Sequence, residues 1–86
     1  MIKIYTIPEC KYCNELKEIL TTENIPFNEI NVMLNENEEE YKKISEMSKS
    51  DQVPIVLVGK QLLIPEVSFK SIRECVDLTI RFTKEQ

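Results

Sequence analysis

Cys10 and Cys13 are the residues whose type and spacing could do chemistry. They form a Cys-x-x-Cys pair, and two such thiols can exchange two electrons by closing and opening a disulfide. The pair lies where a strand-like segment passes into a helix-like segment, so Cys10 is expected at a helix N-terminus. Unpaired backbone N–H groups and the helix dipole stabilise a thiolate there, and the thiolate is the form that attacks a disulfide. The second cysteine follows about one helical turn later, so its sulfur can return to the first.

The charges and the third cysteine around this pair bear on its interpretation. Lys11 is expected to favour the Cys10 thiolate and Glu9 to oppose it. The same Cys-x-x-Cys spacing also serves zinc sites, but such a site needs four Cys or His ligands. The chain has one further cysteine, Cys75, and no histidine. A redox pair is therefore favoured over half of a zinc site or a pair of core cysteines, and no bound metal is expected.

The composition is that of a small globular protein. The 86 residues are enough for one domain over 1–86, and 42% apolar and 30% charged residues are an ordinary balance. A net charge of −4 without a basic cluster argues against binding to nucleic acid or to an anionic membrane. Residues 1–5 contain no apolar run of signal-peptide or membrane-span length. The cytoplasm, where thiols stay reduced, is the expected compartment, and the expected state is a monomer.

The hydrophobic pattern predicts seven elements that position the cysteine pair. Strands are expected at 2–6, 27–32, 55–58 and 61–64, and helices at 11–23, 36–48 and 68–82. The order β-α-β-α-β-β-α implies a parallel strand pair with a right-handed crossover, followed by an antiparallel hairpin. The predicted fold class is α/β, with a mixed four-stranded sheet flanked by three helices. This is the architecture of thioredoxin-like domains.

The apolar positions of the two later helices are expected to face the core. Tyr41, Ile44 and Met47 form the predicted inner face of the 36–48 helix, whose glutamates at 36 and 38–40 are interpreted as a solvated helix start. The last helix is expected to bury the stripe Phe69, Ile72, Val76 and Ile80. Cys75 lies at the edge of that stripe and is interpreted as a small buried hydrophobe, with a regulatory or glutathionylated thiol as the alternative.

A second signal is the segment Gln52-Val53-Pro54 before the apolar run 55–58, which follows the polar stretch 48–52. A proline in this place can simply open a strand, since it cannot donate to the ladder. A cis Pro54 would instead turn the backbone N–H and C=O of Val53 toward an extended thiol substrate, which would then bind by strand addition. Such a proline would also keep a metal away from the cysteine pair.

With these features the whole chain resembles a glutaredoxin. The resemblance rests on Ile4-Tyr5-Thr6 leading into Cys10-Lys11-Tyr12-Cys13, on Val53-Pro54 and on the order of elements. It implies that Cys10 is the nucleophile, that Cys13 is the resolving thiol and that the two form the redox disulfide. Tyr12 matches the tyrosine of the family's C-P-Y-C motif and would flank glutathione, while Lys11 replaces the usual proline. Val53 would pair with the cysteinyl backbone of glutathione.

The sequence departs from the family pattern at three places. Ile7 or Pro8 stands where the family often has a lysine, and Gln52 stands where it usually has a threonine before Val-Pro. The family's Gly-Gly and following acidic pair, which hold the amino end of glutathione, are replaced by the segment 64–68. Within it, Glu66 and Ser68, on either side of Val67, are expected to substitute, because both can accept hydrogen bonds near a helix start.

The resemblance implies reduction of protein disulfides and of glutathione mixed disulfides. Glutathione would be a co-substrate, no cofactor would be bound, and ribonucleotide reductase would be one possible electron acceptor. An alternative is a glutaredoxin-like protein recharged by the flavoprotein thioredoxin reductase. A rival of another class is an iron–sulfur module that holds a cluster between two chains through Cys10 and added glutathione. A redox-inactive adapter is a third possibility, which the presence of both cysteines disfavours.

Overall fold

The computed structural model describes residues 1–50 and 52–85, so the Asp51 position of the predicted polar stretch lies outside the described residues. Within these described residues there are four strands and three α-helices. In chain order they are β1 (Ile2–Thr6), α1 (Lys11–Thr22), β2 (Asn28–Asn31), the short 3-10 helix η1 (Asn35–Asn37), α2 (Glu38–Ser48), β3 (Ile55–Val58), β4 (Gln61–Leu63) and α3 (Ile72–Lys84). The predicted order of strands and helices is confirmed, with η1 as an addition.

The strands form one mixed sheet in the order β2-β1-β3-β4. Strand β1 runs parallel to β2, with Tyr5 opposite Ile30, and antiparallel to β3, with Ile4 opposite Val56. Strands β3 and β4 form the antiparallel hairpin. The central position of β1 matters for the site, because the loop that carries Cys10 follows directly after the last residue of β1, Thr6.

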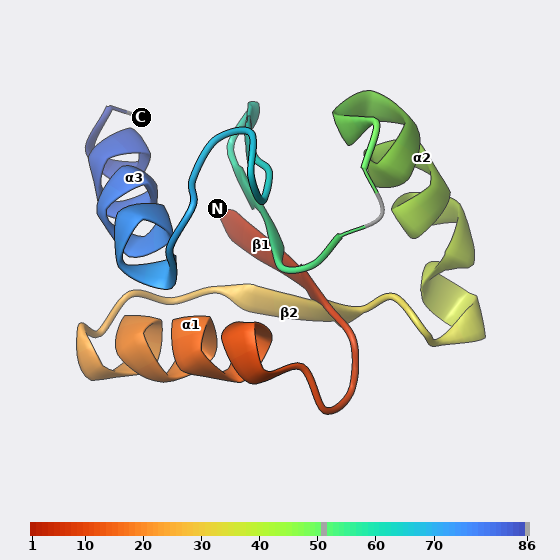
Figure 1. Cartoon of the computed structure of the whole chain (residues 1–86), viewed down its shortest axis with the longest axis horizontal. Helices are drawn as coiled ribbons and strands as arrows, with labels where there is room; N and C mark the ends of the chain where they lie inside the picture. Colours follow the sequence, from red (N-terminus) through yellow and green to blue (C-terminus); the bar gives the residue numbers. More distant parts are fainter. Residues whose placement is uncertain (51, 86) are drawn as a thin grey trace.

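The helices cover the two faces of the sheet in an unequal way. Figure 1 shows α1 and α3 together on one side of the strands and α2 on the other. Alternation along β1 explains this arrangement, since successive side chains of a strand point to opposite faces. Ile4 packs in the core with Leu16 of α1 and Val76 of α3, whereas Tyr5 packs with Ile44 of α2. The sheet is therefore sandwiched, and α1 is held firmly against the centre of one face.

The inner face of α2 differs from the prediction. Ile44 is buried as expected, but Met47 is 65% exposed and Ser48 takes the inward position one residue later. Both residues lie within one turn of Ile44, so helical spacing alone allows either. The buried Ser48 hydroxyl is satisfied locally, because it donates toward the carbonyl oxygen of Ser45 or Ser50. The predicted acidic start is also more than a solvated face, because Glu40 accepts a hydrogen bond from the Tyr5 hydroxyl.

Helix α3 begins at Ile72, four residues later than predicted. Phe69 is buried but belongs to the preceding turn, and its spacing only imitates a helical position. The helix starts with a variant of the capping box, in which the Ser71 Oγ accepts from the N–H of Glu74 while the Glu74 carboxylate accepts from the N–H of Lys70, one residue before the N-cap. The fully buried stripe of α3 contains Cys75, Val76 and Thr79, with Ile72 at its start, while the predicted Ile80 is only half-buried.

Candidate active site

Cys10 and Cys13 are joined by a disulfide, with 5.2 Å between their Cα atoms. Cys10 is the N-cap residue of α1 and has an extended backbone, while Cys13 lies in the first turn of the helix. The first helical hydrogen bond runs from the N–H of Asn14 to the carbonyl of Cys10 at 3.0 Å. The prediction that the pair sits at the start of a helix is confirmed.

The two sulfurs of the pair have different environments. Cys10 is half-buried, whereas Cys13 is 0% exposed, so a molecule from solvent can reach only the first sulfur. The backbone N–H of Cys13 donates to the Cys10 Sγ at 3.1 Å. A hydrogen bond from a helix-start N–H, together with the helix dipole, favours negative charge on the acceptor. The geometry therefore favours a thiolate at Cys10 when the pair is reduced.

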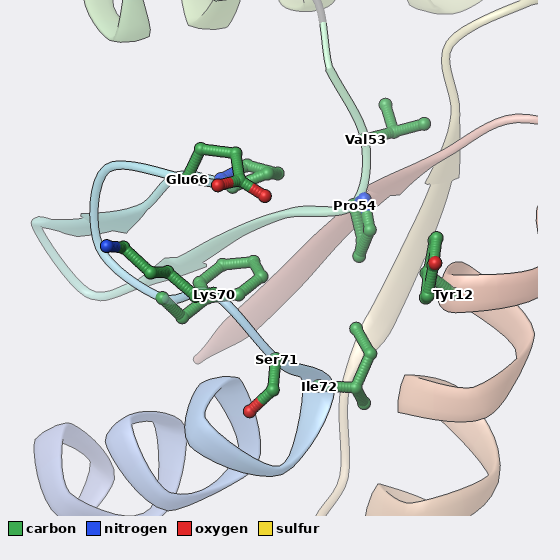
Figure 2. Close-up of a pocket in the computed structure, with 9 residues that line it drawn as sticks. Tyr12, Val53, Pro54, Glu66, Lys70, Ser71 and Ile72 are labelled. Atoms are coloured by element: carbon green, nitrogen blue, oxygen red, sulfur yellow. The ribbon is translucent and has the colours of Figure 1, made fainter.

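A groove runs beside the cysteine loop. It is formed by the first turn of α1, the segment before β3, and the chain that leads into α3 (Figure 2). The peptide bond between Val53 and Pro54 is cis, which corresponds to the second of the two interpretations of Pro54 that the sequence left open. The residues that line the groove are Tyr12, Val53, Pro54, Pro65, Glu66, Phe69, Lys70, Ser71 and Ile72. Most of these side chains are apolar, so the groove can hold an extended segment and exclude water from it.

The structure brings together only part of the predicted binding set. The predicted residues that line the groove are Tyr12, Val53, Pro54 and Glu66. The predicted residues that lie outside it are Lys11, Gln52, Val67 and Ser68. Lys11 borders a different surface hollow that is lined by Glu9, Asn14, Glu15 and Glu18.

The expectation that Ser68 lies near a helix start is wrong, because α3 begins only at Ile72. Its hydroxyl instead holds the preceding turn, where it accepts from the N–H of Ile64 and donates toward the carbonyl of Leu62. The residues that sequence reasoning missed are Phe69, Lys70, Ser71 and Ile72. The pattern Ser71-x-x-Glu74 is a capping-box signature and could have placed the helix start correctly.

A charged network supports the base of α1 from β1 and β2. The Glu29 carboxylate accepts from the Lys17 ammonium at 2.7 Å and from the buried Thr6 hydroxyl at 2.8 Å. The hydrogen bond from Lys17 lowers the pKa of Glu29, against a smaller opposing effect of burial. This network ties the end of β1 and the second turn of α1 to β2.

Cys75 lies apart from the pair, in the core under α3. It is a free thiol and 0% exposed, which confirms its interpretation as a small buried hydrophobe. Burial raises the pKa of the Cys75 thiol to about 12, although the hydrogen bond with Thr79 works against this shift. This thiol is therefore protonated and shielded at neutral pH.

Within residues 1–50 and 52–85, no three or more His, Cys, Asp or Glu side chains are grouped so as to hold a metal ion. In the same part of the chain, no helix has the length and apolar character needed to cross a membrane.

The sheet order, the three helices and the cysteine pair at the start of α1 define a protein of thioredoxin-like fold with a Cys-x-x-Cys centre. Residues 2–63 match the family model described as glutaredoxin. The chain belongs to the glutaredoxin family. The family and the cysteine pair together make it a thiol–disulfide oxidoreductase.

Individual relatives agree with this assignment. A glutaredoxin-like 8.6 kDa protein in the rubredoxin operon of Clostridium pasteurianum is 33% identical over 64 residues, which cover 74% of this chain and 83% of that protein. The glutaredoxin of Archaeoglobus fulgidus has a TM-score of 0.71 at 23% identity, covering 93% of this chain and 85% of its own. A buckwheat glutaredoxin–glutathione complex has a TM-score of 0.74 at 11% identity, covering 98% and 76% respectively. The two structures support the fold.

Proposed function

We propose that this glutaredoxin reduces protein disulfides and glutathione mixed disulfides by dithiol exchange, with Cys10 as the nucleophile and Cys13 as the resolving thiol. The observation that carries the proposal is the asymmetry of the pair. One sulfur is accessible and accepts a helix-start N–H, while the other is fully buried one turn away. An accessible thiolate suits attack on an external disulfide, and a shielded partner suits attack from within.

The reaction then proceeds in two balanced steps. The Cys10 thiolate attacks one sulfur of the substrate disulfide, a new S–S bond forms, and the other substrate sulfur leaves as a thiolate. The Cys13 thiolate next attacks the Cys10 sulfur, which releases the second substrate sulfur and closes the Cys10–Cys13 disulfide. The substrate gains two electrons and two protons, and the enzyme loses them. No bound cofactor is needed, because the cysteine pair carries the electrons.

The groove beside the pair is the proposed binding site for the substrate. Tyr12 and Pro54 would flank the attacking sulfur, and the backbone of Val53 would pair with an extended segment by strand addition. Glutathione is a co-substrate in this proposal, in line with the buckwheat relative, which was solved as a glutathione complex. Four predicted binding residues lie outside the groove and would contact only polypeptide substrates that extend beyond it. These residues are Lys11, Gln52, Val67 and Ser68.

The physiological setting follows from the family resemblance. We propose a monomer of one domain over residues 1–86, acting in the cytoplasm on disulfide-bearing proteins such as ribonucleotide reductase. Two glutathione molecules, or a flavoprotein such as thioredoxin reductase, would return the oxidised pair to the dithiol.

A coupled NADPH assay tests this function. The protein is supplied with insulin or a glutathione mixed disulfide, once with glutathione and glutathione reductase and once with thioredoxin reductase. Sustained NADPH consumption that is lost in Cys10→Ser supports the proposal, and the system that sustains it identifies the reductant. No consumption in either system, together with a stable chromophore after anaerobic reconstitution with iron and sulfide, would replace it with the iron–sulfur module.

A further inference from the structure

The large apolar side chains that remain exposed are concentrated at one end of the molecule. Among residues 1–50 and 52–85 they are Met1, Ile7, Tyr12, Met33, Leu34, Met47 and Val67. Apart from Met1 and Met47, they belong to the segments that follow β1, β2 and β4. The pairing directions put the ends of these three strands at the same edge of the sheet, where the cysteine loop begins. Exposed apolar residues that are scattered singly need no explanation, but a concentration of them marks a contact surface.

The turn after β2 lies beside the cysteine loop. The N–H of Val32 donates to the carbonyl of Thr6 at 2.9 Å, which joins the first residue after β2 to the last residue of β1. The two chains therefore leave the sheet at the same end (Figure 1). Just beyond this hydrogen bond, Ile7 on one chain and Met33 and Leu34 on the other have exposed side chains. We call these three residues the β2-side patch.

Hydrogen bonds within the turn after β2 hold Met33 and Leu34 in place. The side-chain oxygen of Asn31 accepts from the N–H of Met33 at 2.9 Å, and its backbone carbonyl accepts from the N–H of Leu34 at 3.2 Å. The Asn37 side-chain amide donates to the same Asn31 carbonyl at 2.8 Å, and the Asn37 N–H donates to the carbonyl of Leu34 at 3.0 Å. These polar groups are engaged inside the turn, so the turn offers apolar side chains to a partner. Because the turn is already ordered, little conformational freedom is lost when a partner binds to it.

The loop that carries Cys10 lies between the β2-side patch and the groove. In the sheet order β2-β1-β3-β4, β2 adjoins one side of β1, and β3, which Pro54 directly precedes, adjoins the other. The cysteine loop continues from β1, so the patch and the groove flank it on opposite sides. A small disulfide that occupies the groove leaves the patch uncovered. A protein that presents its disulfide to the half-buried Cys10 brings surface over both sides, and an apolar surface there would bury the patch.

We propose that the β2-side patch is a docking surface for protein substrates, continuous with the site where Cys10 meets the substrate disulfide. The partner is a protein whose disulfide is bordered by an apolar surface, and small disulfides do not reach the patch. The proposal rests on the dithiol exchange proposed above and extends its substrate site beyond the groove. The patch contributes to binding alone, and Cys10 and Cys13 keep the chemistry.

The test compares a protein disulfide with a small one, because only the protein can cover the patch. Second-order rate constants are measured in single-turnover reactions of the pre-reduced protein with insulin and with bis(2-hydroxyethyl) disulfide. We expect the double variant Met33→Ser/Leu34→Ser to reduce insulin about three- to tenfold more slowly, because apolar area buried on docking is lost. Its rate with the small disulfide should match that of the parent protein. The difference should persist at high NaCl, since apolar contacts, unlike ion pairs, are not screened by salt.

Met47→Ser is the matched control. Met47 is 65% exposed against 68% for Met33, but it lies in the last turn of α2, at the opposite end of that helix from the turn after β2. This variant should reduce both disulfides at the parent rates. Met33→Leu keeps an apolar side chain and should keep the insulin rate.

The single variant Met33→Ser should show a smaller loss with insulin in the same direction, and it decides the matter if the double variant does not fold. An unchanged insulin rate in the serine variants of the patch, or an equal loss with both disulfides, would overturn the proposal. If the parent protein reduces neither disulfide, the dithiol exchange itself fails.

Discussion

The backbone N–H of Cys13 donates to the Sγ of Cys10 across 3.1 Å, so the proposed resolving residue also supports the proposed nucleophile. This relationship depends on the start of α1 at Lys11, which leaves Cys10 as the N-cap with an extended backbone. It explains how a chain without histidine can activate a thiol, since a backbone donor and the helix dipole take the place of a side-chain base.

Single replacements of the two cysteines are expected to give different failures. Cys10→Ser should abolish disulfide reduction, because the accessible nucleophile is lost. In Cys13→Ser the Cys10 thiolate should still attack the substrate disulfide, but the reaction should stop at the mixed disulfide because the resolving thiol is missing. Intact-protein mass spectrometry after incubation with a peptide disulfide should find the adduct only in Cys13→Ser. Cys75→Ser is the matched control and should reduce the peptide like the parent protein, because Cys75 is buried away from the pair. An adduct that forms equally in Cys10→Ser would contradict the assignment.

Alkylation of the reduced protein should distinguish the three thiols by their reaction rates across a pH series. Cys10 should react fastest with iodoacetamide over the neutral to mildly alkaline pH range, because its sulfur is accessible and accepts a hydrogen bond from the helix-start N–H of Cys13. Cys75 should stay unmodified in the native protein across this range, because burial raises its pKa to about 12 and shields its sulfur. Peptide mapping by mass spectrometry across a pH series measures both rates. In guanidinium all three cysteines should react alike, which serves as the control. Equal labelling of Cys10 and Cys75 in the native state would refute this prediction.

Acid sensitivity should depend on the Glu29 network. The pKa of Glu29 is lowered in the native state by the hydrogen bond from Lys17, so the ionised carboxylate stabilises the fold relative to the unfolded chain. That contribution is complete above the ordinary value of 4.5 and is lost as the pH falls through the lower native value. Glu29→Gln should therefore be less stable than the parent protein at about pH 7, and the difference should shrink toward about pH 3.

Urea unfolding followed by circular dichroism at several pH values measures this change. Glu18→Gln, which removes an exposed carboxylate from the same region of α1, is the control and should leave the pH dependence unaltered. A stability difference for Glu29→Gln that is constant with pH would show that the carboxylate contributes by packing alone.

The contact between β1 and α2 should be measurable through Tyr5. Tyr5→Phe keeps the buried ring but removes the hydroxyl that donates to Glu40 at 2.8 Å, so the free energy of unfolding should fall by about 1–2 kcal/mol. Burial, and then Glu40, raise the pKa of Tyr5, so its hydroxyl contribution is complete below the ordinary value of 10.0 and is lost as the pH rises through the native value.

Chemical unfolding at about pH 7 checks the loss, with Tyr12→Phe as the control. The Tyr12 ring is 61% exposed, so removing its hydroxyl should change stability little. Equal stabilities of Tyr5→Phe and the parent protein would mean that the Tyr5–Glu40 hydrogen bond only replaces one to water.

Local signals in the sequence were enough for the first part of the fold. The strand 2–6 was predicted with both of its observed ends, and the first helix was predicted to begin at Lys11, where α1 does begin. The predictions were wrong where helical spacing is compatible with more than one buried residue or helix start. Met47 and Ser48 both lie within a turn of Ile44, and only packing against the sheet selects Ser48. Phe69 mimics a helical position, although the chain turns once more before the capping box at Ser71.

The sequence by itself determined the reactive pair, because everything that places Cys10 and Cys13 at a helix start lies within a few residues of them. The groove was decided by tertiary structure alone. Tyr12, Val53 and Ile72 come from three segments far apart in the chain, and they meet because β1 is central and α1 and α3 pack on the same face of the sheet.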